Sequence, residues 1–172
     1  MTFEFNASNV ISSCALLLTV CSLWMTRRHQ KLSVTPHLGG FSNRNITDEG
    51  LIFSYELSNN GIGPARIKKF VWLLHGKEFA GPADKYGNYT EALLREHLGN
   101  KIGYTIRNAF TFGVDSCLKQ GDAQNIVDLF IPGVNQSNLT EVLAKIEGVE
   151  LMVEYESFYG QRFVFDTRVK RE

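Results

Sequence analysis

The stretch that decides the fold class is VELMVEYESFYGQRFVFDTRVK, residues 149–170. Apolar and polar residues alternate on both sides of its centre, and this period of two is typical of half-buried strands. Between the two runs, residues 158–160 fit a three-residue hairpin loop with Gly160 in the left-handed conformation. The resulting register places Glu156 opposite Arg162, which favours an ion pair between the strands. The stretch therefore predicts an antiparallel hairpin at the end of the chain.

Other parts of the chain carry strand signals as well. Residues 51–57 alternate between apolar and polar side chains, and further stretches rich in apolar residues are bounded by turn residues. Residues 39–45, with two adjacent glycines, are expected to form a loop. Besides the hairpin, the expected strands cover residues 32–38, 51–57, 66–74, 104–114 and 125–131.

Two short helices are expected between the strands. Thr90 is the expected cap of a helix that ends at Gly99, and Asn138 with Glu141 resembles a capping box in front of a second helix. Short strands with two helical inserts indicate a mainly β domain, built as an antiparallel, Ig-like β-sandwich. A small closed β-barrel is the alternative.

The N-terminal segment has a different character. Residues 7–25 read ASNVISSCALLLTVCSLWM and contain no charged side chain, whereas Arg27, Arg28 and Lys31 follow closely. About 20 such residues are enough for a helix to cross roughly 30 Å of hydrocarbon. A removable signal peptide would carry positive charge ahead of its apolar core, and residues 1–6 contain no Lys or Arg. We therefore predict a retained, single-pass transmembrane helix.

The charges behind this helix predict its direction in a bacterial inner membrane, because Lys and Arg gather on the cytoplasmic side. The expected anchor covers residues 1–26. A juxtamembrane segment with a basic start, a short strand and a loop covers residues 27–48, and a cytoplasmic β domain covers residues 49–172. The alternative is a periplasmic or lumenal domain of opposite topology, in which five Asn-x-Ser/Thr triplets would be possible glycosylation acceptors.

Small side chains recur along one stripe of the predicted helix. They follow one another at steps of four and three residues, and small residues let transmembrane helices approach closely. The alternative is that their hydroxyl groups bond carbonyl groups of the same helix. The expected self-association face consists of Ser8, Ser12, Ala15, Thr19 and Ser22. The residues expected to contact anionic lipid are Arg27, Arg28 and Lys31.

The composition argues against several classes of function. The chain has 18 basic and 18 acidic residues, so it lacks the basic field that nucleic-acid binding needs. Cys14 and Cys21 lie in the apolar span, which leaves Cys117 alone in the domain and provides no disulfide framework. The sequence has no nucleophile elbow, no zinc motif and no phosphate-binding glycine motif. We therefore expect no enzyme, no catalytic residue, no metal site and no cofactor.

Two stretches resemble parts of known proteins. The stretch LSNNGIGPARI, residues 57–67, resembles a loop of small bacterial proteins of unknown function that have an N-terminal membrane helix and a β-sandwich. The ending YESFYGQRF, residues 155–163, is similar to their final hairpin. The resemblance implies an architecture and no functional residue. Glycine can adopt backbone angles that other residues avoid, and proline has a fixed φ, so the glycines and the proline of these stretches are expected to form turns. The expected structural turn residues are Gly61, Gly63, Pro64 and Gly160.

Two functions of different classes are consistent with these features. The first is a non-catalytic module that binds a protein partner at the inner membrane face, through exposed strand edges. The second is a small-molecule-sensing effector whose membrane helix self-associates. Its layout is similar in outline to the membrane-anchored β-barrel effectors of bacterial anti-phage systems. The expected partners are membrane lipid, a protein and a second copy of the chain, but no nucleic acid.

Overall fold

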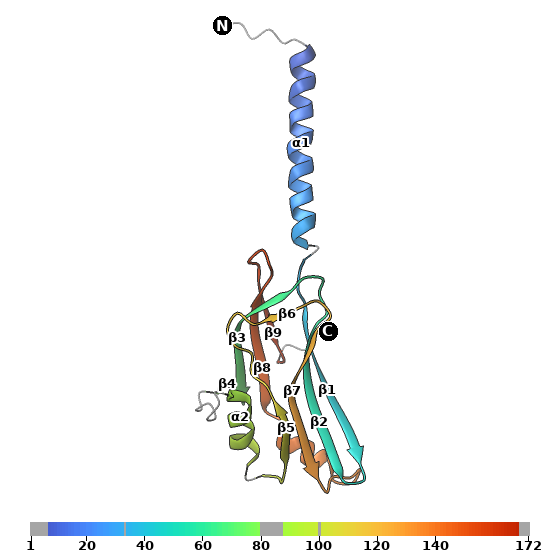
Figure 1. Ribbon diagram of the computed structural model, residues 1–172, viewed down its shortest axis with the longest axis vertical. Helices are drawn as coiled ribbons and strands as arrows, with labels where there is room; N and C mark the ends of the chain where they lie inside the picture. Colours follow the sequence, from blue (N-terminus) through green and yellow to red (C-terminus); the bar gives the residue numbers. More distant parts are fainter. Residues whose placement is uncertain (1–6, 33, 80–87, 100, 169–172) are drawn as a thin grey trace.

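The computed structural model describes residues 7–32, 34–79, 88–99 and 101–168 (Figure 1). The chain is mainly β, with 41% of it in strands, and it has one long N-terminal helix. This helix, α1 (Ala7–Leu32), stands away from the β domain (Figure 1). Its large apolar side chains, such as Leu16 and Leu18, are exposed. No Gly or Pro interrupts it. It is long enough and apolar enough to cross a membrane.

The first antiparallel sheet has the strand order β1-β2-β7-β5. β1 (Leu38–Thr47) pairs with β2 (Gly50–Asn59) over ten positions, and β2 pairs with β7 (Ala123–Pro132). β5 (Thr105–Ala109) pairs with the other side of β7. β1 and β5 are therefore the edges of this sheet.

The second antiparallel sheet has the order β4-β3-β8-β9, and β6 pairs with the start of β3. One helix, α2, precedes β5, and another, α3, precedes β8. The bounds of these elements are β3 (Ala65–Leu74), β4 (Lys77–Glu78), α2 (Tyr89–Leu98), β6 (Cys117–Leu118), α3 (Leu139–Ile146), β8 (Val149–Glu156) and β9 (Arg162–Asp166).

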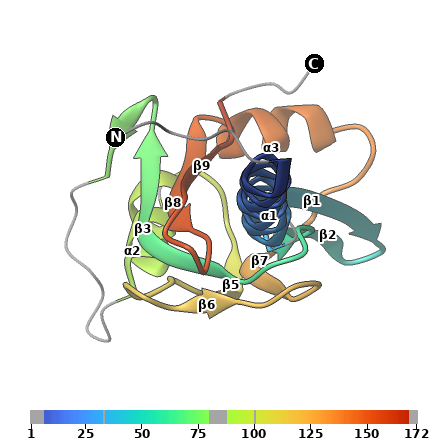
Figure 2. The same ribbon diagram turned by 90° about the horizontal axis from the view of Figure 1, so that it is seen from above.

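Side chains of both sheets form one hydrophobic core. Leu57 and Leu129 of the first sheet and Ile67, Leu151 and Val153 of the second are at most 1% exposed. Burying one such side chain contributes roughly 1.5–3 kcal/mol. Viewed along α1, β1 and β2 lie on one side of the helix axis and β3 and β8 on the other (Figure 2). The described strands form two open sheets and no closed barrel, so the barrel alternative does not hold.

Most of the expected strands are present. The structure confirms strands over residues 51–57, 66–74 and 125–131 and extends each of them slightly. Of residues 104–114, only Thr105–Ala109 form a strand.

The sequence-based expectation differs most from the structure around β1. The expected strand over residues 32–38 is wrong except at its last residue, because α1 continues to Leu32, residues 34–37 form no strand and β1 begins at Leu38. The expected loop over residues 39–45 is also wrong, because these residues lie inside β1. Most β1 side chains are exposed, so no apolar alternation marks the strand in the sequence. Its backbone pairing with β2 holds it in the sheet.

The expected cap is wrong at α2, whereas at α3 the expected residue, Asn138, is the N-cap but lacks the expected capping bond. Asn88, not Thr90, caps α2: its Oδ1 accepts hydrogen bonds from the backbone N–H groups of Thr90 and Glu91. The buried Thr90 hydroxyl instead accepts a bond of 2.8 Å from the Trp72 Nε1. Asn138 precedes α3 but its side chain makes no cap bond, so there is no capping box. At α2 a tertiary partner, Trp72, thus bonds the hydroxyl that was expected to cap the helix.

The C-terminal hairpin has the expected register. Glu156 lies opposite Arg162, and Gly160 in the loop has a φ of 74°. The expected ion pair between these two strands is wrong, because Glu156 contacts Arg66 at 3.2 Å and Lys68 at 3.1 Å on β3. β8 lies between β3 and β9, so its side chains have a second neighbouring strand that the hairpin sequence does not reveal.

Candidate binding site between the sheets

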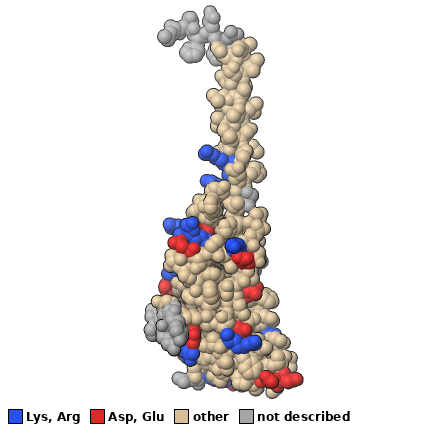
Figure 3. Space-filling model, in the orientation of Figure 1, with Lys and Arg blue, Asp and Glu red and all other residues tan. Residues whose placement is uncertain are grey.

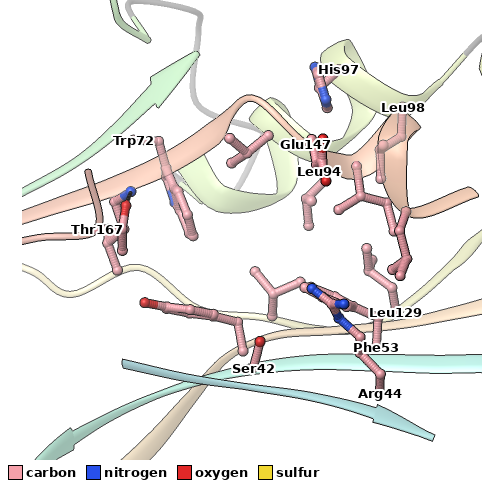
Figure 4. Close-up of a pocket in the computed structure, with 16 residues that line it drawn as sticks. Ser42, Arg44, Phe53, Trp72, Leu94, His97, Leu98, Leu129, Glu147 and Thr167 are labelled. Carbon is pink, nitrogen blue, oxygen red and sulfur yellow. Dashed lines mark hydrogen bonds between the residues drawn. The ribbon is translucent and has the colours of Figure 1, made fainter. Parts of the chain in front are cut away.

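A cavity of about 220 Å³ lies between the two sheets, next to α2 and α3 (Figure 4). Its walls are mostly apolar. Its volume is somewhat below the roughly 300–1,000 Å³ of typical ligand pockets. Among the residues that line it are Phe53 and Leu129 of the first sheet, Trp72 and Leu151 of the second, Leu94 of α2 and Ile146 of α3.

The spacing of these residues places their side chains on the inward faces of the strands and helices. Phe53 and Tyr55 are two residues apart on β2 and share the face that points to the core. Leu94 and Leu98 are four residues apart on α2 and share one side of the helix. The hydrogen bond from Trp72 to α2 fixes the sheet against the helix at the cavity wall. The cavity is thus framed by rigid elements.

Tyr55, which is half-buried, brings a hydroxyl group to the cavity. A Cβ atom on Gly40 of β1 would collide with this hydroxyl and with the ring of Phe165. Gly40 therefore supplies space within a strand, which is one of the few reasons for a glycine there. Burial raises the pKa of Tyr55 from its ordinary value of 10.0 to about 12, so the hydroxyl remains a hydrogen-bond donor even in moderately alkaline solution.

Arg44 brings a positive charge to the same cavity. It belongs to β1, and its guanidinium group is turned toward the cavity (Figure 4). It has no ion-pair partner within the part of the chain that the structure describes. Ser42 and Thr167 add hydroxyl groups to the lining. A permanently charged, unpaired arginine beside apolar walls suits a ligand with an anionic head and an apolar body.

His97 of α2 is a buried titratable group in the cavity wall. It is 4% exposed, and its Nε2 has no hydrogen-bond partner among the described residues. Burial, and after it the charge of Lys101, lower the pKa of His97 below its ordinary value. Its ring contacts the ring of His75 at a centroid distance of 5.9 Å. The structure thus brings together two histidines that look scattered in the sequence.

β1, whose Ser42 and Arg44 side chains line this cavity, is an edge strand of the first sheet. No backbone hydrogen bond joins Phe41–Ile46 to a described strand other than β2, and the pairing with β2 contains no bulge. Phe41 is 64% exposed on this strand. β1 therefore presents a row of unpaired backbone groups, without the proline or bulge that often protects such an edge.

The residues of the small-residue stripe lie exposed on α1. The Ser12 hydroxyl donates to the Ser8 carbonyl oxygen and the Thr19 hydroxyl to the Ala15 carbonyl oxygen, both at 2.8 Å. These bonds match the alternative interpretation of the stripe, and Ser22 lies on the same exposed helix. The stripe and the cavity belong to separate parts of the molecule.

The basic residues lie at the end of α1 that is next to the domain (Figure 3). Arg27, Arg28 and Lys31 are exposed. The Arg28 guanidinium lies 5.8 Å from the centre of the Trp24 ring, a cation–π contact. The structure brings these residues together with Tyr159 of the β8–β9 loop, which lines the same surface hollow.

The expected turn glycines are needed for two reasons: some for a positive φ, and others because there is no room for a Cβ atom. Gly160 has the expected positive φ, but Gly61 and Gly63 do not. A Cβ atom on Gly61 or Gly63 would collide with the chain that enters from α1, between Val34 and His37. Glycine is needed there because two segments pass in close contact. Pro64 follows and leads into β3.

Asn59 is an organising residue that the sequence did not reveal. It is fully buried, and its Nδ2 donates to the Gly63 and Leu118 carbonyl oxygens at 2.8 and 3.0 Å. Its Oδ1 accepts from the backbone N–H groups of His37 and Gly61 at 3.1 and 3.0 Å. The run Asn59-Asn60-Gly61 predicts a surface turn, so only the distant partners His37 and Leu118 disclose the role of Asn59.

The described residues contain no group of three or more His, Cys, Asp or Glu side chains that is placed to hold a metal ion. Cys117 is exposed on β6. No protein-family model matches the chain, and no curated protein matches it.

Proposed function

We propose that the chain is a membrane-anchored, non-catalytic binding module. In this proposal the two sheets form an Ig-like β-sandwich that captures a protein partner at the inner face of a bacterial membrane. The observation that carries the proposal is the open edge of β1, whose backbone groups from Phe41 to Ile46 have no second strand among the described residues.

An extended segment of a partner fits such an edge. Strand addition uses main-chain hydrogen bonds for affinity and side-chain contacts for specificity. Phe41 is the exposed apolar contact on β1, and Asn43 and Asn45 add exposed polar groups on the same face. An edge of ten residues gives room for several backbone bonds.

The membrane part of the proposal depends on α1. Its uncharged part, residues 7–26, has a length of about 30 Å at 1.5 Å per residue, which matches the hydrocarbon thickness. Arg27, Arg28 and Lys31 on the domain side support a cytoplasmic domain. Digestion of the domain by protease added outside intact spheroplasts would support the periplasmic alternative instead.

A photo-crosslinking residue at Phe41 tests the edge in cells. We expect one defined adduct from this position and none from Val164, which is 59% exposed on β9 and serves as the control. The double variant Phe41→Lys/Asn45→Lys should remove capture of the crosslinked protein, because charges on an edge oppose strand addition. Equal adducts from both positions, or unchanged capture by the double variant, would overturn the proposal.

The cavity favours a second function, the sensing of a small molecule. Arg44, unpaired among the described residues, lies beside apolar walls and a buried His97 with an unsatisfied nitrogen. A cavity of about 150 Å³ already holds benzene, so this one has room for a ring or a short acyl chain. The ligand class is a small apolar carboxylate or a related anion.

A thermal-shift experiment on the full chain in nanodiscs tests this second function. Octanoate should raise the midpoint of unfolding of the natural chain, because a ligand that binds only the folded state stabilises it. Octanol serves as the uncharged control, and Arg44→Gln should remove the difference between the two. No shift with octanoate or with a panel of aromatic carboxylates would exclude this ligand class.

A further inference from the structure

We infer that the end of the domain next to α1 is a lipid-binding surface. The tip of the β8–β9 hairpin and the β2–β3 turn rest on the headgroups of the anionic bilayer that holds α1. This inference rests on the proposed membrane anchoring by α1 and goes beyond it. The ligand of this surface is the layer of lipid headgroups.

Local hydrogen bonds fix which end of the domain faces the membrane. The Thr35 carbonyl oxygen accepts a bond from the Ile62 backbone N–H at 3.1 Å, and the His37 carbonyl oxygen accepts from Asn60 at 2.8 Å. Only two residues lie between Leu32, the last residue of α1, and Thr35, so the three chain steps that join them span at most about 11 Å. The β2–β3 turn therefore stays close to the end of α1 whatever the tilt of the helix.

The tip of the β8–β9 hairpin lies at the same end of the domain (Figure 1), and it carries two aromatic residues. Phe158 is 78% exposed and Tyr159 is 48% exposed, and their rings meet edge to face at 5.7 Å. Ile62 in the β2–β3 turn is 61% exposed. Single exposed apolar residues are common on proteins. Three large ones next to a candidate transmembrane helix indicate an interaction surface.

Tyr159 also connects the hairpin tip with the base of α1. It lines a surface hollow together with Trp24, Arg28 and Lys31. Figure 1 shows the β8–β9 loop reaching the level of the end of α1 that is next to the domain. The aromatic tip and the basic end of α1 thus lie at one level.

The chemistry of this surface suits lipid headgroups. Tyr and Trp favour the headgroup level, since their rings have an apolar body and a polar edge. Basic residues near an anionic leaflet contribute about 1 kcal/mol each. Arg27, Arg28 and Lys31 supply such charges, whereas Arg66 and Lys68 at the same end of the domain are already paired with Glu156. Apolar insertion and charge attraction therefore act together at the tip.

Contact at the turn and at the hairpin restricts the rotation of the domain around α1. The seated domain holds the β1 edge at a constant height above the bilayer. Because the domain is already restricted, less orientational entropy is lost when a membrane-bound partner binds the β1 edge.

Fluorescence quenching by brominated lipids tests the inference with the full chain. Phe158→Trp is placed in nanodiscs that contain phosphatidylglycerol, with and without brominated acyl chains. The control is Tyr89→Trp, because Tyr89 is 49% exposed at the start of α2, in the half of the domain away from α1 (Figure 1). The emission of the parent chain, from Trp24 and Trp72, is subtracted from that of each variant.

We expect the added emission of Phe158→Trp to be lost in brominated lipid and that of Tyr89→Trp to be kept. If Trp24 is quenched but the tip is not, the inference is wrong and the anchor remains. If Trp24 is not quenched either, the proposed anchoring is wrong. Thermal unfolding of both variants checks that their folds are intact, as expected for substitutions at exposed positions.

Discussion

Asn59 illustrates what one side chain contributes to this domain. Its buried amide makes four hydrogen bonds that join the chain entering from α1, the β2–β3 turn and β6. A buried polar group that loses its partner costs roughly 1–3 kcal/mol. Three segments that are distant in the sequence therefore depend on one amide.

Asn59→Leu keeps a similar volume and removes all four bonds. We expect the free energy of unfolding to fall by about 3 kcal/mol, because two N–H and two C=O groups lose their partner. Thermal unfolding of the full chain in nanodiscs, followed by circular dichroism, measures this loss. Asn60→Ala in the exposed neighbouring position should change the stability by less than about 0.5 kcal/mol. Equal losses in the two variants would contradict the role of the amide.

His97 makes the stability of the domain dependent on pH. Its pKa in the folded chain lies below the ordinary value of 6.5, first through burial and then through Lys101. Below pH 6.5 the unfolded chain therefore binds a proton that the folded chain does not, and the free energy of unfolding falls. We expect full stability above pH 6.5 and a loss as the pH falls through 6. His97→Gln should flatten this slope, as measured by unfolding at a series of pH values; an unchanged slope would assign it to other groups.

At the scale of elements, the turns depend on glycine for two different reasons. Gly160 needs its positive φ of 74°, and nothing lies within 4 Å of the place of its Cβ atom. Gly63 has no positive φ but lies directly against the backbone of Val34. The first glycine answers a conformational requirement and the second a steric one.

Paired substitutions separate the two reasons. Gly160→Ala should cost about 1 kcal/mol of stability, as a left-handed residue does, and Gly160→Asn should recover part of it, since asparagine tolerates that conformation. Gly63→Ala should cost about 2–3 kcal/mol, because overpacking moves the backbone. Gly63→Asn should be worse than Gly63→Ala. Recovery by asparagine at Gly63 would show that conformation, not space, limits that position. Urea or thermal unfolding gives all four values.

At the scale of the whole molecule, a helix that can cross a membrane is joined to a β domain by a short, bonded connection. The connection from Val34 to His37 leaves little slack, since its backbone is bonded to the β2–β3 turn. Restricting a domain to a surface raises its effective concentration for partners on that surface. In the proposed function, α1 and the β1 edge therefore act together: the helix holds the domain at the membrane, and the edge binds the partner there.

Deletion of residues 1–26 tests whether capture at the β1 edge depends on membrane anchoring. We expect the shortened chain to leave the membrane fraction and to lose the adduct formed from Phe41. An unrelated transmembrane helix in place of residues 7–26 should restore both, because the tether acts through concentration. Fractionation and crosslinking yield measure the two effects. Capture that survives deletion would show that the β1 edge binds strongly enough without a membrane.

Periodicity in the sequence was sufficient for the elements that bury one face. The strands over residues 51–57, 66–74 and 125–131 and the hairpin register were predictable, because alternation and turn chemistry act between near neighbours. β1 was missed, since an exposed edge strand has no apolar pattern and is held by backbone pairing. The same strand supplies Arg44 and the open edge, so most of the candidate site was missed with it.

By itself, the sequence determined an uncharged helix long enough for a bilayer, a mainly β domain and a glycine hairpin at its end. These features depend on composition, on the spacing of apolar residues and on local backbone conformation, and all three are properties of residues close together in the sequence. Only the tertiary structure decided that Arg44 and His97 share a cavity, that Asn59 joins three segments and that Glu156 pairs with β3. Each of these contacts joins residues distant in sequence, and the packing of the two sheets sets their distances.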